Sequence, residues 1–273
     1  MSLEAAERAV REGDLYSALQ SLQEQIRARP ADAELRVFLF QLLCVMGQWE
    51  RAQAQLDVAA ELDPGALAMA QMYREAIRCE MLRSDVFAGR RSPVVFGEPD
   101  QWIALLIESL ASNASQAGTL REQAFEAAPA SSGSINGETF EWIADADMRL
   151  GPVCEAVING QYYWVPFDRL SRIELEPPAD LRDVVWMPAH FQFANGGEAV
   201  GVIPARYPGS HGSDDAQVCL GRKTIWVEGP AEVFSGLGQR VLTTDSGDHA
   251  LMDVRSIVIG DAAPAQAQPP THA

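Results

Sequence analysis

The stretch GDLYSALQSLQEQIRARP at residues 13–30 is matched by GQWERAQAQLDVAAELDP at residues 47–64, 34 positions further along the chain. Both stretches carry the same residue at four equivalent places, namely Gly13 and Gly47, Ala18 and Ala52, Leu22 and Leu56, and Pro30 and Pro64. Glycine tolerates the positive φ of a turn, alanine lets packed helices approach, and proline ends a helix because it lacks an N–H group. The pattern therefore predicts two consecutive helix–turn–helix units.

The spacing of 34 residues is that of the tetratricopeptide repeat. We expect helices at about 2–12, 14–28, 32–46, 48–62, 66–83 and 100–127. The segment LRVFLFQLLCVM at 35–46 is apolar on nearly every face, which is typical of a helix buried in the middle of a stack. One period after Gly47 the chain has Met81, so the third unit is degenerate, as terminal repeats often are.

Stacked helix pairs form a concave surface that commonly binds a peptide or a helix. Repeat numbering gives the positions expected to face this groove, which are Glu34, Val37, Gln41, Gln71, Glu75 and Arg78. The acidic members would favour a ligand that carries lysine or arginine at complementary steps. We therefore expect these residues to form a partner-binding site.

The second half of the chain has a different period. Residues 127–137, AAPASSGSING, have the composition of a linker, and beyond them apolar residues alternate with polar ones, as in a strand. We expect strands at residues 154–158, 162–165, 172–176, 183–187, 198–203, 223–227, 239–243 and 253–259. Their short spacing and the turn residues between them favour an antiparallel barrel or sandwich.

The predicted fold class is thus α+β, with an N-terminal TPR-like helical-repeat domain followed by an antiparallel β-rich C-terminal domain. We place the repeat domain at residues 1–127, a linker at 128–137, the β-rich domain at 138–261 and a tail at 262–273. The tail is expected to be disordered because its composition offers little apolar surface to bury.

Composition and charge narrow the classes of partner and the compartment. The chain has 38 acidic and 21 basic residues, a formal net charge of −17, which argues against nucleic acid and against anionic lipid as partners. No signal peptide and no apolar run long enough to cross a membrane are visible in the sequence. The cysteines, none of which forms a CxxC motif, are expected to be reduced. These features predict a cytoplasmic protein.

The candidates for chemistry are few. Asp145 and Asp147 would share one face of a strand, so a hard cation is conceivable there, although a strand end rich in aspartate explains them as well. None of the four histidines forms an HxH, HExxH or HxxxH pair, and Ser210 beside His211 has poor geometry for catalysis. The GxG at 236–238 lacks the strand-to-helix context of a phosphate loop. We therefore predict no cofactor, no metal and no enzymatic activity.

Several ordered motifs carry more information than composition does. They are DADMRLGP at 145–152, GQYYWVP at 160–166, LRDVVW at 181–186, LGRKTIW at 220–226 and GQR at 238–240. Together with the helical-repeat front end, this set resembles the ImpE/SciE (TagJ) family of type VI secretion accessory proteins over nearly the whole chain.

The resemblance implies a bacterial cytoplasmic protein that acts as a non-enzymatic adaptor. It implies binding of the N-terminal helix of the small contractile-sheath subunit, of the TssB or VipA type, and an influence on sheath recycling by the ClpV unfoldase. No catalytic residues carry over from the family. A helix as ligand agrees with the expectation from the repeats alone.

Two other readings stay open at this point. In one, the β-rich domain is an enzyme or binds a small ligand and carries a repeat module, and this reading requires Asp145, Asp147 and His190 to converge in one pocket. In the other, the protein is a general repeat chaperone that binds many unrelated helices with similar affinity.

Overall fold

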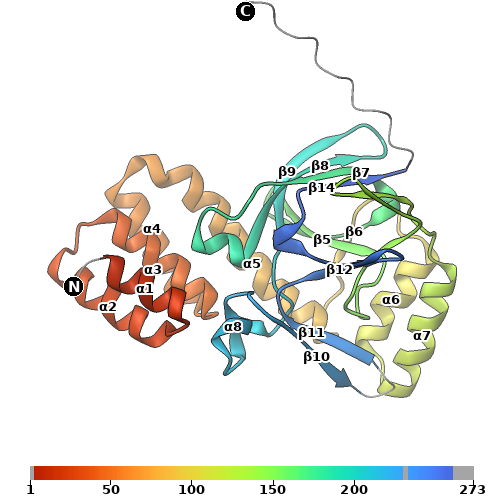
Figure 1. Ribbon diagram of the computed structural model, residues 1–273, viewed down its shortest axis with the longest axis horizontal. Coiled ribbons are helices and arrows are strands. Elements are labelled where there is room, and N and C mark those ends of the chain that lie inside the picture. Colours follow the sequence, from red (N-terminus) through yellow and green to blue (C-terminus); the bar gives the residue numbers. More distant parts are fainter. Residues whose placement is uncertain (1–2, 230–232, 261–273) are drawn as a thin grey trace, which may run out of the picture.

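The first half of the protein is a stack of antiparallel helix pairs, as the repeats predict. The computed structural model describes residues 3–229 and 233–260. Its first helices are α1 (Leu3–Glu12), α2 (Leu15–Ala28), α3 (Ala33–Val45), α4 (Trp49–Leu62) and α5 (Leu67–Phe87). Figure 1 shows α1 to α4 stacked side by side, with α5 leading from the stack toward the sheet.

Local chemistry accounts for the boundaries of these helices. Asp14 and Asp32 each accept a hydrogen bond from a backbone N–H three residues on, at 2.9 and 3.1 Å, so they cap α2 and α3. Gly13 and Gly47 have φ of +84° and +66°, the left-handed conformation that glycine adopts most readily. The repeated residues therefore place both helix-to-helix turns.

The helix expected at 100–127 is two helices, α6 (Gln101–Ala111) and α7 (Ala114–Ala127). Ser112 is extended, and the Asn113 side chain accepts a hydrogen bond from the backbone N–H of Gln116 at 3.2 Å. The prediction of one helix was wrong because it gave no weight to this asparagine cap, which begins a new helix after a sharp turn. The two helices then pack on each other beside the sheet (Figure 1).

The second half forms a large, mostly antiparallel sheet. It has nine strands in the order β1-β6-β5-β9-β8-β7-β14-β2-β3, and only β1 and β6 run parallel. The strands are β1 (Val94–Val95), β2 (Gly133–Ile135), β3 (Glu138–Phe140), β5 (Val153–Ile158), β6 (Gln161–Pro166), β7 (Leu170–Leu175), β8 (Trp186–Phe193), β9 (Glu198–Pro204) and β14 (Ser256–Ile259). In the described part of the chain β1 and β3 stay at opposite edges, so the sheet is open and the barrel alternative is not realised.

Two smaller sheets and one short helix complete the fold. The three-stranded sheet has the order β13-β12-β4, and β10 pairs with β11 as a two-stranded ribbon. These elements are β4 (Ile143–Asp145), β10 (Thr224–Gly229), β11 (Val233–Gly238), β12 (Val241–Thr244), β13 (Gly247–Ala250) and α8 (Ala216–Cys219).

Two sequence expectations differ from the structure in detail, and a third is not tested by it. The expected strand at 183–187 begins as a 3₁₀ turn, η3 (Leu181–Val184), and becomes a strand only at Trp186. Part of the expected linker is β2, which pairs with both β14 and β3. The expectation of a disordered tail at 262–273 falls outside the described residues.

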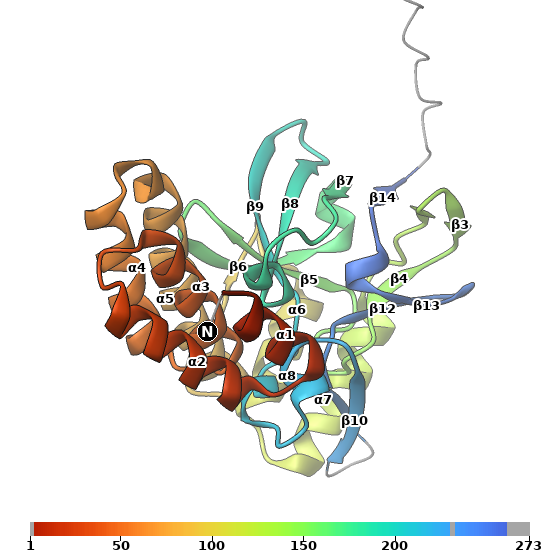
Figure 2. The same ribbon diagram turned by 60° about the vertical axis from the view of Figure 1, so that its left-hand side comes forward.

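The two halves share a hydrophobic core. One cluster of buried side chains joins Leu39 and Phe40 of α3 to Trp164 of β6 and Trp186 of β8. A second cluster, which includes Phe191, occupies the other face of the sheet. The helical stack is therefore packed against the sheet, and both views show α5 running alongside it (Figures 1 and 2).

Candidate functional site at the helix–sheet junction

Aromatic side chains fill the junction between the helices and the sheet. Trp186 at the start of β8 is fully buried, and its ring lies 6.0 Å from that of Trp49 and 5.6 Å from that of Tyr73. Its indole Nε1 donates a hydrogen bond to Glu80 of α5 at 3.2 Å. The Arg182 guanidinium stacks 5.0 Å from the Tyr73 ring, a favourable cation–π distance. The segment LRDVVW at 181–186 is thus a docking element within the chain.

Two arginines from the second half reach the ends of repeat helices. The Arg206 guanidinium donates to the Val45 carbonyl at 2.9 Å, at the end of α3. The Arg222 guanidinium donates to the carbonyls of Val10 and Arg11, at 3.2 and 2.9 Å, at the end of α1. The last carbonyls of a helix lack internal partners and carry partial negative charge, so both contacts are stabilising. Burial lowers the pKa of Arg206 to about 10.

A buried ionic network runs from α5 into the sheet. Arg83 forms two hydrogen bonds with Glu155 of β5, at 2.7 and 2.9 Å, and Arg240 bridges Glu155 and Asp145. Tyr162 donates to the same Glu155 carboxylate. All four charged residues are buried, and their charges balance. A buried charge is tolerated when it is paired and hydrogen-bonded, so the network ties the two halves together.

The two carboxylates of this network have opposite pKa shifts. For Glu155, burial would raise the pKa, but the charges of Arg83 and Arg240 outweigh burial and lower it to about 2. For Asp145, burial dominates over the single charge of Arg240 and raises the pKa to about 6. The difference follows from the number of cations that each carboxylate contacts.

Asp147 also forms hydrogen bonds within the fold. Its carboxylate accepts hydrogen bonds from the Arg149 side chain at 2.9 and 2.5 Å and from the backbone N–H of Gly236 at 2.9 Å. His190 lies elsewhere, on β8, with its imidazole 3.6 Å from Glu198 of β9. Asp145, Asp147 and His190 are therefore not brought together in one pocket. Within residues 3–229 and 233–260, no cluster of three or more histidine, cysteine or acidic side chains could hold a metal ion.

The residues predicted to bind a partner are only partly brought together. Gln71 and Glu75 line a groove of about 410 Å³ between α5 and the neighbouring strands β5 and β9. Arg78 is exposed next to them and pairs with Glu75 at 2.9 Å.

The other three predicted positions lie on α3, away from that groove. Glu34 is exposed, Val37 is half-buried, and Gln41 is only 6% exposed. As folded, Gln41 therefore offers little surface to a partner. The α3 helix packs against η3, a contact that repeat numbering could not reveal because η3 lies far along the chain.

Sequence reasoning missed the apolar walls of the groove, here named the α5–β9 groove. Met72 of α5 and Val200 of β9 line it, and they are 41% and 71% exposed. Its floor includes Ala76, Val157 and Val202. The polar–apolar pattern of α5 could have pointed to Met72, whereas Val200 reads as an ordinary strand residue.

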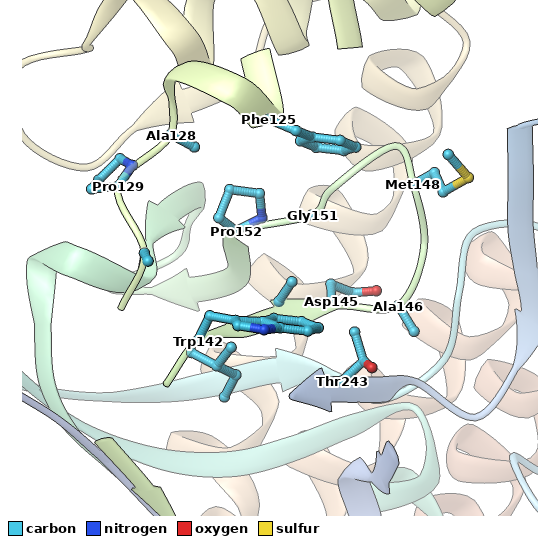
Figure 3. Close-up of a pocket in the computed structure, with 13 residues that line it drawn as sticks. Phe125, Ala128, Pro129, Trp142, Asp145, Ala146, Met148, Gly151, Pro152 and Thr243 are labelled. Atoms are coloured by element: carbon cyan, nitrogen blue, oxygen red, sulfur yellow. The ribbon is translucent and has the colours of Figure 1, made fainter. Parts of the chain in front are cut away.

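A second cavity of about 410 Å³, here named the Trp142 pocket, lies between the end of α7 and the edge of β4. Figure 3 shows Phe125, Pro129, Trp142 and Pro152 around it, with Thr243 and Asp145 on the side of the small sheet. Its lining is mainly apolar, which is typical of binding sites.

The fold and the junction define a class: tetratricopeptide-repeat proteins in which the repeats are docked on a mostly antiparallel sheet. A tetratricopeptide-repeat model matches residues 9–76, and a model described as ImpE protein matches residues 137–258. A relative from Pseudomonas aeruginosa PAO1, named type VI secretion system accessory component TagJ, is 52% identical over 92% of this chain and 90% of its own length. The chain belongs to the ImpE family.

A solved structure has the same fold. The crystal structure of a Vibrio parahaemolyticus protein matches with a TM-score of 0.85 and 29% sequence identity, covering 94% of this chain and 98% of the other. The resemblance drawn from the ordered motifs is thus confirmed. Those motifs supply the Arg182, Trp186, Arg222 and Arg240 contacts of the junction.

Proposed function

We propose that this chain is a non-enzymatic accessory protein of a type VI secretion system that works in the bacterial cytoplasm. Its partner is the N-terminal helix of the small contractile-sheath subunit, and through it the protein influences sheath recycling by the ClpV unfoldase. The 52% identical relative, whose name places it in such a system, supports the accessory role. Repeat stacks commonly bind helices, which supports a helical ligand.

The α5–β9 groove is the observation that carries this proposal. Met72 and Val200 present exposed apolar side chains on its walls, and Ala76 and Val202 form an apolar floor. Gln71 and Glu75 add polar groups among the lining residues. An apolar strip with polar groups beside it suits the apolar face of an amphipathic helix, whose anchors recur at three- and four-residue steps.

Backbone geometry narrows the groove at one end. Gly160, in the turn between β5 and β6, has φ of +73°, and a Cβ there would lie 3.0 Å from Cγ of Glu75. The turn can therefore approach α5 only because residue 160 is glycine. This approach fixes the distance between the sheet and the helix that form the two walls.

The partner-binding residues we propose are therefore Gln71, Glu75 and Arg78 from the predicted set, together with Met72 and Val200. Glu34, Val37 and Gln41 remain a separate proposal for the α3 face. The two faces can be told apart because substitutions in one do not touch the other.

A binding assay with a synthetic peptide of the sheath subunit's N-terminal helix tests the groove. Val200→Asp should weaken binding by about tenfold or more, since it places a charge against an apolar helix face. Tyr16→Asp, an equally exposed site on α2 outside the groove, is the matched control and should bind as the unaltered chain does. Equal affinities for both variants would contradict the groove, and loss through Glu34→Arg instead would assign binding to α3.

The influence on ClpV is tested separately. Sheath disassembly by the unfoldase should respond to the unaltered chain and should not respond to Val200→Asp. An unrelated amphipathic helix of the same length serves as specificity control. Similar affinity for that control would favour a general repeat chaperone over a sheath adaptor.

A further inference from the structure

The Trp142 pocket combines aromatic and proline surfaces in one apolar site. Trp142 is 40% exposed, although a tryptophan ring gains most from burial. Phe125 and Pro152 lie across from it, and Figure 3 shows all three around the same space. The volume of about 410 Å³ is within the range of ligand pockets, which begins at ~300 Å³.

One wall of the pocket is the free edge of a strand. In the β13-β12-β4 sheet, β4 lies at the edge, and the Ala146 N–H donates to the Val241 carbonyl of β12. In an antiparallel ladder such pairs alternate, so the N–H and C=O of Ile143 point away from β12. The Asp145 N–H, which points the same way, donates to the Gly151 carbonyl at 2.7 Å. Ile143, which lines the pocket, therefore presents one donor and one acceptor to an extended segment.

The last described strand, β14, ends beside the segment that leads into this pocket. In the β14–β2 ladder Ile259 lies opposite Gly133, and the Gly260 N–H donates to the Ser132 carbonyl at 2.8 Å. Because β14 and β2 are antiparallel, β14 runs toward the residues that precede β2, which include residue 130. Ala130 lines the Trp142 pocket.

The sequence that follows has the matching chemistry. Residues 261–273 read DAAPAQAQPPTHA, with small apolar residues around Pro264. Proline-containing segments favour the extended polyproline II conformation and bind aromatic-lined grooves at low entropic cost. We propose that residues 262–266 of this chain bind in the Trp142 pocket, with Pro264 against the Trp142 ring. This site is independent of the α5–β9 groove and does not rest on the proposed function.

Because the segment is attached to the chain close to the pocket, it can stay bound even when its intrinsic affinity is low. An extended chain advances by about 3.3 Å per residue, so a few residues beyond Gly260 suffice to enter the pocket. A segment tethered this closely has an effective concentration on the order of millimolar. Weak apolar contacts can therefore keep the segment bound for most of the time.

Truncation after Gly260 provides the first test. Amide hydrogen exchange of Ile143, whose N–H points away from β12, should become about tenfold faster than in the full chain, as expected when a segment that is bound nine-tenths of the time is removed. Amides of β8, which lie in the large sheet, should not change and serve as internal control. Unchanged exchange at Ile143 would overturn the proposal. Protection that depends on protein concentration would overturn it too, since a second copy would then be the occupant.

Binding in trans provides the second test. A synthetic peptide of residues 261–273, titrated into the truncated chain and followed by chemical-shift changes at residues 142–146, should bind weakly and saturably. Trp142→Ala should abolish this binding, whereas Trp226→Ala should leave it intact, because Trp226 is 42% exposed and does not line the pocket. Pro264→Gly in the peptide should weaken it. Equal binding to both tryptophan variants would overturn the proposal.

Discussion

The helix–sheet junction and the α5–β9 groove contrast in nearly every physical respect. The junction buries aromatic rings and the paired charges of Arg83, Glu155 and Arg240. The groove exposes apolar side chains, and its lining includes a single charged residue, Glu75. The family motifs supply the junction and hardly touch the groove. A motif set can therefore identify a family by its architecture while the surface available to partners lies elsewhere.

The junction also explains why the repeats and the sheet are placed in one arrangement. Apolar packing is tolerant of small shifts, but the hydrogen bonds of a buried ion pair require defined atom positions. Arg83 comes from the helical half, and Glu155 comes from the sheet. A rotation of one half against the other would break both hydrogen bonds of this pair inside a buried environment.

The largest effect on stability is expected when the Arg83–Glu155 ion pair of the junction is removed. Arg83→Leu should lower the free energy of unfolding by about 3–5 kcal/mol, because it leaves buried polar partners unpaired. Urea denaturation measures the loss. Arg90→Leu removes an exposed ion pair with Asp85 at the end of α5 and should cost less than ~1 kcal/mol. Similar losses in the two variants would show that the junction is held by apolar packing alone.

The second effect is a dependence of stability on pH. Burial raises the pKa of Asp145 from 3.8 to about 6, so between these values the folded chain binds more protons than the unfolded chain. The contribution of Asp145 to stability is therefore present at low pH and is lost as pH rises through about 6. Glu155, with a pKa lowered to about 2, has the opposite sign, and its contribution is lost as pH falls below 4.5.

Asp145→Asn isolates the first of these contributions. Relative to the unaltered chain, the variant should lose the decline in melting temperature between about pH 4 and pH 6. Thermal unfolding across this range measures it, and comparison with the unaltered chain cancels the other carboxyl groups. Parallel pH profiles for the two proteins would contradict a raised pKa for Asp145.

A smaller effect is expected where the sheet half holds α1. Arg222→Ala removes hydrogen bonds to the carbonyls of Val10 and Arg11 and should cost about 0.3–1 kcal/mol, since the arginine is exposed. Hydrogen exchange should speed up in α1 and stay constant in α7. Arg172→Ala, at an exposed ion pair within the sheet, is the control. Faster exchange throughout the stack would mean that α1 depends on more than this contact.

The smallest effect on stability is expected in the α5–β9 groove. Such a result would strengthen the contrast between the groove and the junction. Met72→Asp should change the free energy of unfolding by less than ~0.5 kcal/mol, since Met72 is 41% exposed and lines a surface groove. The same variant should weaken binding of the sheath-subunit helix. A large loss of stability would show that the groove walls are structural, and the comparison with the junction would fail.

Local signals in the sequence accounted for most of the helical half. The caps Asp14 and Asp32 and the turn glycines act within a few residues, so spacing alone predicted the first helices. The break between α6 and α7 was missed because the helical periodicity continues across it, although Asn113 caps α7. The short strand β2 was missed because it lies in a segment with the composition of a linker, and β3 and β4 were indicated only by the alternation beyond residue 137, without bounds.

The candidate site was less predictable. Repeat numbering gave Gln71 and Glu75, which lie on one face of α5. The ionic network of the junction could not be deduced, since Arg83 and Glu155 are 72 residues apart and only the folded chain brings them together. Val200 was missed because its exposure depends on which elements cover that part of β9, not on its neighbours in sequence.

Gly47 shows both what the sequence determines and what only the folded chain decides. The sequence by itself determined that a turn occurs there, because the repeat places glycine where a positive φ is needed. Only the tertiary structure decided what lies against that turn: a Cβ at residue 47 would sit 2.3 Å from the His211 ring of the second half. Turns and caps follow from interactions over a few residues, which a sequence displays directly. The junction, the groove and the Trp142 pocket depend on surfaces that meet only after the chain has folded.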